Sequence, residues 1–124
     1  MNAELEPPMH VKRTIILATG LSITLGIGTA AQAAEAVTLQ LGIRNHRFEP
    51  AELRAPADTP IEIVVRNEDA TAEEFESTSL KVEKVIAGGR QIIVRLRPLA
   101  AGRYPFGGEY NAATASGVLV IGDN

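Results

Sequence analysis

The sequence contains no cysteine and no tryptophan, and methionine occurs twice among its 124 residues. The absence of cysteine excludes disulfides, thiol nucleophiles, thiolate metal ligands and iron–sulfur clusters. Both methionines, Met1 and Met9, lie near the N-terminus, so the rest of the chain also lacks thioether ligands. The folded part must therefore be held together by its hydrophobic core alone.

An excess of basic charge is also absent, because 12 Lys and Arg stand against 15 Asp and Glu, for a net charge of −3. The sequence shows no basic face, so nothing in it indicates a nucleic-acid partner. The two histidines are His10 and His46, and no Ser/His/Asp arrangement can be named. The Gly107-Gly108 pair is not a phosphate-binding loop, since neither a lysine nor a helical pattern follows it. We therefore expect no nucleic-acid binding and no enzymatic activity.

The N-terminal segment has the pattern of a secretory leader. Lys12 and Arg13 precede an apolar run over residues 14–29, and a small-x-small sequence follows at residues 31–33. The run is short and interrupted by glycine, whereas a membrane-spanning helix needs about 20 apolar residues. We expect cleavage before Ala34 and export to the periplasm, with a retained membrane anchor as the alternative.

Residues 1–33 are thus assigned to the signal peptide and residues 34–124 to one small domain. Short apolar segments with period-2 alternation are separated by turn signals throughout this domain. Tyr104, after Gly102, resembles the tyrosine corner of Greek-key sandwiches, whose hydroxyl bonds to upstream backbone. The pattern predicts an all-β Greek-key sandwich of about seven strands, at residues 37–43, 51–55, 61–66, 80–86, 91–97, 103–106 and 117–121.

An acidic segment, residues 68–77, follows the β-branched strand predicted at 61–66 and is expected to begin a loop. Loops at the end of a rigid β scaffold often carry binding sites. If Phe75 points into the core, Glu74 and Glu76 share the opposite face, and Glu73 lies on the Phe75 side.

These acids also have structural interpretations. Glu68 and Asp69 are expected to be turn residues. Glu73 can be a solvated loop acid. Glu74 and Glu76 can form exposed ion pairs with Arg95 or Arg97, which contribute about 0–1 kcal/mol each.

Several short motifs occur in a fixed order along the mature domain: Phe48-Glu49-Pro50, Arg66-Asn67, Gly102-x-Tyr104-x-Phe106 and Gly117. With these motifs the domain resembles a cupredoxin over nearly its whole length. Residues 73–77 and 83–86 carry a narrower resemblance, to the EfeO-type cupredoxin-like domains of bacterial iron uptake, including the stand-alone versions encoded with iron permeases.

Electron-transfer cupredoxins bind copper with two histidines, a cysteine and an axial methionine. The resemblance places the first histidine at Glu73, the cysteine at Gly108, the second histidine at Asn111 and the methionine near Ala115. None of these ligands is present, which excludes type 1 copper. Asn111 is expected to cap a helical turn rather than to bind a metal.

The resemblance also implies that several loops meet at one pole of the sandwich. The candidate metal ligands there are His46, Glu73, Glu74, Glu76 and Glu109. Imidazole and carboxylate suit copper(II), iron or manganese better than copper(I). His46 as a surface histidine and the glutamates as solvated acids are the alternatives.

The expected function is that of an exported metal-handling accessory of bacterial iron uptake, which binds copper(II) or iron. A membrane iron permease is the expected partner, and a homodimer is a further expectation. The alternative is a degenerate cupredoxin that acts as a protein-interaction module without a metal.

Overall fold

The computed structural model describes residues 28–30 and 34–123. Nearly all of the predicted signal peptide, including its cleavage site, lies outside these residues. Among the residues described, no helix has the length and apolar character needed to cross a membrane.

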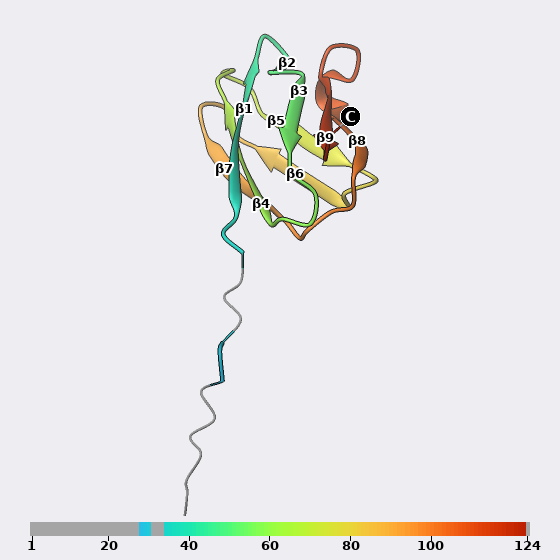
Figure 1. The fold of residues 1–124 in the computed structure, drawn as a ribbon. Helices are drawn as coiled ribbons and strands as arrows, with labels where there is room; N and C mark the ends of the chain where they lie inside the picture. Colours follow the sequence, from blue (N-terminus) through green and yellow to red (C-terminus); the bar gives the residue numbers. More distant parts are fainter. Residues whose placement is uncertain (1–27, 31–33, 124) are drawn as a thin grey trace, which may run out of the picture. The chain divides into compact units, whose positions relative to one another are not determined.

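The described part of the chain forms nine strands and one short 3₁₀ helix. The strands lie in two mixed sheets, one in the order β2-β1-β4-β7 and the other in the order β3-β9-β8-β5-β6 (Figure 1). The predicted all-β sandwich is confirmed. The elements are β1 (Val37–Arg44), β2 (Arg47–Glu49), β3 (Glu52–Ala55), β4 (Ile61–Asn67), β5 (Glu73–Ser77), β6 (Val82–Ile86), β7 (Gln91–Leu96), β8 (Gly102–Gly107), η1 (Glu109–Asn111) and β9 (Ser116–Ile121).

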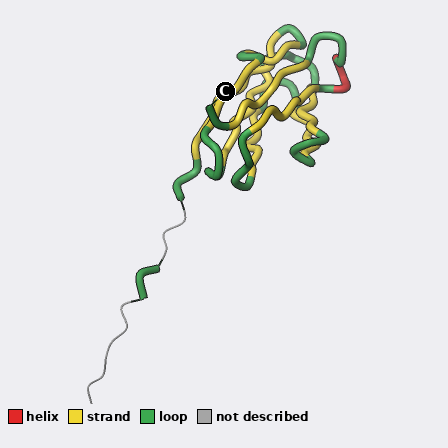
Figure 2. The backbone as a smooth tube through the Cα atoms, turned by 45° about the vertical axis from the view of Figure 1, so that its right-hand side comes forward, coloured by secondary structure: helices red, strands yellow, loops and turns green. Residues whose placement is uncertain are grey.

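Successive strands repeatedly change sheet. β1 pairs with β4 in parallel, and β3 pairs with β9 in parallel, so each pair is joined through strands of the other sheet. The remaining pairs are antiparallel. Figure 2 shows the helical turn η1 at one end of the sandwich.

Two strands were not predicted. β2 has only three residues, and it forms a tight hairpin with β1 where the sequence indicated a loop. β5 occupies the second half of the acidic segment, where we expected a loop to continue. Glu73, Phe75 and Ser77 are all buried, as expected for alternate residues of a strand. Because acidic residues take part in this alternation, the sequence lacks the apolar pattern from which a strand is predicted.

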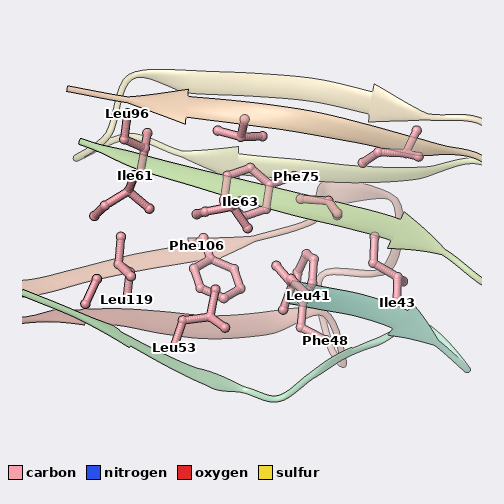
Figure 3. Packing of buried hydrophobic residues seen from close by; sticks show 14 of the residues in the cluster. Leu41, Ile43, Phe48, Leu53, Ile61, Ile63, Phe75, Leu96, Phe106 and Leu119 are labelled. Atoms are coloured by element: carbon pink, nitrogen blue, oxygen red, sulfur yellow. The ribbon is translucent and has the colours of Figure 1, made fainter. Parts of the chain in front are cut away.

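The core lies between the sheets, because alternate residues of each strand point inward. In β4, Ile61, Ile63 and Val65 are almost completely buried. The second sheet contributes Phe75 and Phe106, whose ring centroids are 5.1 Å apart. Figure 3 shows these aromatic side chains packed with the aliphatic residues of the facing sheet.

Tyr104 makes the bond expected of a tyrosine corner. Its hydroxyl donates a hydrogen bond of 2.8 Å to the carbonyl oxygen of Ala100. This bond fixes the entry into β8, the strand that leads to η1.

Replacing Phe75 with alanine should lower the free energy of unfolding by about 3–5 kcal/mol, because it leaves a cavity among packed side chains. The measurement is equilibrium denaturation in urea. Val85, whose side chain is 54% exposed on β6, provides the control, and Val85→Ala should change stability by about 0.5 kcal/mol or less. Equal losses for both variants would contradict the packing described.

Candidate metal centre

Three segments that are distant in sequence meet at one end of the sandwich. They are the β1–β2 turn, the residues from the end of β4 to the start of β5, and the loop that contains η1. The third segment reaches the other two through Thr114, whose hydroxyl donates to the carbonyl of His46 at 2.6 Å, and through Asn111, which bonds Glu73. The expected meeting of these loops is confirmed.

His46 is held by a two-residue hairpin turn. Asn45 and His46 have φ values of 51° and 59°, the left-handed conformation that a type I′ turn requires at both positions. The carboxylate of Asp69 accepts hydrogen bonds from the backbone N–H groups of Asn45 and His46, at 2.8 and 3.0 Å. Asp69 therefore fixes the direction in which the imidazole projects.

Asp69 is more than the turn residue that the sequence indicated. Burial alone would raise the pKa of its carboxyl, but the backbone hydrogen bonds from His46 and Asn45 outweigh this and lower the pKa. One of its oxygens lies 3.6 Å from His46 Nδ1. Nothing local in the sequence marks this residue as a candidate ligand, because the group that it contacts lies more than twenty residues earlier.

Glu73 is the most deeply buried acid of this region, with 1% of its surface exposed. Its Oε1 lies 2.5 Å from Nδ1 of His46, and the Asn111 side-chain amide donates to both of its carboxylate oxygens at 3.0 Å. The hydrogen bond to Glu73, together with the negative charges of Glu73 and Asp69, raises the pKa of His46. Asn111 was expected to cap a helical turn, but its side-chain amide bonds Glu73 instead.

Asn67, the last residue of β4, stabilises this arrangement through the hydrogen bonds of its side chain. Its buried side-chain amide donates to the carbonyls of Thr71 and Ile86, at 2.8 and 3.0 Å, and its Oδ1 accepts from the N–H of Asp69 at 3.0 Å. The side chain thereby ties the turn that carries Asp69 to the end of β6. A buried amide whose hydrogen bonds are all made rigidifies its surroundings.

His46, Asp69 and Glu73 form what we call the polar cluster. One potential ligand atom from each lies within 4.8 Å of the other two. The donors are one imidazole and two carboxylates, a set that suits copper(II), iron or manganese.

The four positions at which the resemblance placed the copper ligands are also brought together. Glu73 bonds Asn111, and the N–H of Gly108 donates to the carbonyl of Ala115 at 3.0 Å. A Cβ atom at Gly108 would lie 2.6 Å from the carbonyl oxygen of Glu74. The chain therefore lacks both the cysteine of a type 1 copper site and the space for its side chain, and that cofactor does not fit.

The five predicted ligands do not form one site. Glu74, Glu76 and Glu109 make up a separate group, here called the acidic triad, whose carboxylate oxygens lie within 4.8 Å of one another. Glu73 and Glu74 are neighbours on β5, and strand geometry points them to opposite faces.

Ion pairs between the glutamates of β5 and Arg95 or Arg97 were an alternative to metal binding. For Arg95 this alternative is wrong. Arg95 lies on β7 in the other sheet, where it pairs with Glu62 at 3.3 Å. Among the described residues, none of the ion pairs includes a member of the acidic triad.

Comparisons with known proteins agree with this fold. The family model described as "Cupredoxin-like domain" matches residues 16–121. An uncharacterized protein of Rickettsia prowazekii (strain Madrid E) is 34% identical over 85 residues, which are 68% of each chain.

Solved structures of cupredoxin type are also similar. The metal-binding domain of the Cu(I)-exporting P-type ATPase CopA of Streptococcus pneumoniae D39, with Cu(I), matches with a TM-score of 0.62 and 14% identity, over 74% of this chain and 97% of that one. Auracyanin A, a blue copper protein of Chloroflexus aurantiacus, matches with a TM-score of 0.61 and 16% identity, over 70% and 99%. At these identities the likeness shows the fold alone.

In the metal-free protein, the imidazole of His46 should titrate above its ordinary pKa of about 6.5. NMR titration of the ring resonances, assigned with His46→Gln, measures this value. Glu73→Gln should lower it toward about 6.5, because it removes the hydrogen bond to a charged carboxylate. A wild-type value at or below about 6.5 would contradict the contact.

The same shift has a consequence for stability. The folded state raises the pKa of His46, so the protonated imidazole stabilises the fold. This contribution to the free energy of unfolding is fully present below the pKa of the unfolded state, about 6.5, and it is lost as the pH rises through the pKa of the folded state. The stability difference between wild type and His46→Gln should therefore be larger at about pH 6 than in alkaline solution.

Gly108→Cys should destabilise the fold by about 1–3 kcal/mol, since its Cβ would collide with the backbone of Glu74. It should also fail to produce a blue copper centre, because His46 is the only histidine among the residues that the structure describes. Urea denaturation and visible absorption with copper(II) measure both outcomes. Ala113→Cys, at an exposed position of the same loop, is the control, and equal stability of the two variants would contradict the close approach.

Proposed function

Because the chain belongs to the cupredoxin-like domain family, we propose that it is a metal-handling protein that binds copper(II) or iron through the polar cluster. The observation that carries the proposal is the convergence of His46, Asp69 and Glu73 beside the family's ligand positions. This is a binding function and not an enzymatic one.

The polar cluster combines a buried carboxylate with an accessible imidazole. Glu73 is 1% exposed, whereas the side chain of His46 is 48% exposed, so an ion can approach from solvent toward a ligand that is fixed in the protein. Asp69 supplies a second carboxylate and is itself held by backbone hydrogen bonds. Ligands whose positions are fixed before binding lose little conformational freedom when the ion arrives.

In the metal-free protein, a hydrogen bond joins Nδ1 of His46 to Oε1 of Glu73, so its proton lies between two atoms that would both bind the ion. A metal that uses Nδ1 must displace this proton, because only the neutral imidazole coordinates. Binding should therefore weaken as the pH falls.

We further propose that the protein is exported to the periplasm and serves as an accessory of bacterial iron uptake, beside a membrane iron permease, as a monomer or homodimer. The support is the leader-like pattern of residues 1–33 and the resemblance of residues 73–77 and 83–86 to the EfeO-type domains.

A protein-interaction module without a metal is the second candidate. It is favoured by the fact that Glu73 needs no ion, since His46 and Asn111 already satisfy both of its carboxylate oxygens. A cupredoxin fold can persist after its metal site has changed, because its function depends on the site and not on the scaffold.

Titration of the purified chain with copper(II), followed by the melting temperature, separates these candidates. At a metal concentration 100-fold above the dissociation constant, binding should stabilise the fold by about 2.7 kcal/mol. His46→Gln and Glu73→Gln should each reduce the shift, because each removes a donor from the polar cluster. Iron and manganese are titrated in the same way to rank the ions.

Glu52→Gln provides the matched control, because Glu52 lies on β3 in an exposed pair with Arg54. It should respond to copper(II) like the wild type, and so should Glu74→Gln, which leaves the polar cluster intact. The absence of a shift with any of the ions would favour the interaction module. An undiminished shift in both cluster variants would show that other residues hold the metal.

A further inference from the structure

One carboxylate oxygen of Glu74, Oε1, is buried without a hydrogen-bond partner among the residues that the structure describes. The residue is 4% exposed, and its Oε1 is inaccessible to solvent and makes no hydrogen bond. Unsatisfied buried polar atoms are rare in native proteins, and each one calls for an explanation such as an ion or a water.

The backbone explains why Glu74 is buried although it points away from the core. η1 packs against β5, and Gly108 lies so close to the strand that a Cβ atom there would lie 2.6 Å from the Glu74 carbonyl oxygen. The loop that contains η1 therefore lies directly against the strand at Glu74.

Two further carboxylates lie beside that of Glu74. Glu76 follows two residues later on the same face of β5, and Glu109 begins η1. Their oxygens and one of Glu74 lie within 4.8 Å of one another. Burial, the negative charges of Glu76, Glu109 and Glu83, and a hydrogen bond with Glu76 all raise the pKa of Glu74.

We propose that the acidic triad binds a hard divalent cation of the manganese or calcium class, at a second site separate from the polar cluster. Its donors are carboxylate oxygens only, the ligands that such ions prefer. Within the described residues 28–30 and 34–123, Oε1 of Glu74 has no partner, and a cation would satisfy it. The proposal does not depend on the proposed function of the polar cluster.

The site is open to solvent on one side. Glu76 and Glu109 line a groove of about 660 Å³ that runs beside β5, β8 and η1. β5 and β8 are paired only at Glu76 and Gly107, which leaves room where the two strands diverge. An ion can therefore enter with part of its hydration shell, and water can complete its coordination.

Manganese(II) is the probe, because the free aqueous ion gives an electron paramagnetic resonance signal that decreases when the ion binds to protein. The full chain should bind manganese(II) at this site, and calcium should compete for it. Glu74→Gln, which keeps the shape of the side chain, should weaken the binding roughly ten-fold or more, since affinity depends on the number of charged ligands. Glu109→Gln should also weaken it, and this exposed position cannot disturb the core.

Two control variants distinguish ligation from general electrostatics and from the other site. Glu83→Gln removes a nearby exposed charge from β6 without removing a ligand, and it should bind manganese(II) like the wild type. His46→Gln alters only the polar cluster and should also bind normally. Circular dichroism verifies that each variant is folded.

The proposal is overturned if the wild-type chain leaves the manganese(II) signal unchanged, which would leave Glu74 holding only a proton. It is also overturned if Glu74→Gln and Glu109→Gln both bind like the wild type, or if His46→Gln abolishes binding. Loss of copper(II) binding in the polar cluster variants with manganese(II) binding preserved would show that the two sites are independent.

Discussion

The burial of two adjacent glutamates on β5 is the constraint on which the rest of this end of the molecule depends. Strand geometry directs Glu73 and Glu74 to opposite faces, and both are almost completely buried. A buried carboxylate is costly unless it is paired or hydrogen-bonded. Glu73 satisfies this need with His46 and Asn111, whereas one oxygen of Glu74 has no partner. The same strand thus creates two chemically different environments.

The surroundings of Glu73 are fixed by backbone hydrogen bonds as much as by side chains. Asn67 holds the turn that follows β4, and Asp69 in that turn holds the hairpin turn that presents His46. Two residues in the left-handed conformation are kept in place by this contact. Unfavourable backbone conformations persist only where neighbouring contacts determine them, and they often cluster at functional sites.

Gly108 allows the loop that contains η1 to approach β5 closely. Without a side chain at this position, the loop lies directly against β5, and the space for a thiolate is filled by the backbone of Glu74. Glu109, the residue after Gly108, lies in the acidic triad with Glu74 and Glu76. The close approach of this loop to β5 thus leaves no space for a side chain at Gly108, and the loop supplies a carboxylate beside those of β5.

The sequence by itself determined the fold class. Period-2 alternation and regular turns predicted the sandwich, and the Gly102-x-Tyr104 pattern predicted the bond from Tyr104 to upstream backbone. The sequence also determined that no blue copper site can form, because it contains no cysteine. β5 escaped prediction because acidic residues replace the apolar ones that normally reveal a strand.

Only the tertiary structure decided how the candidate ligands are grouped. His46 and Glu73 meet, and Asp69 joins them, because the hairpin turn and the loop after β4 end at the same pole. Glu74 is separated from Glu73 by the pleat of a single strand and meets Glu109 through the packing of η1. These contacts join residues far apart in the chain, and local sequence patterns carry no information about which loops will touch.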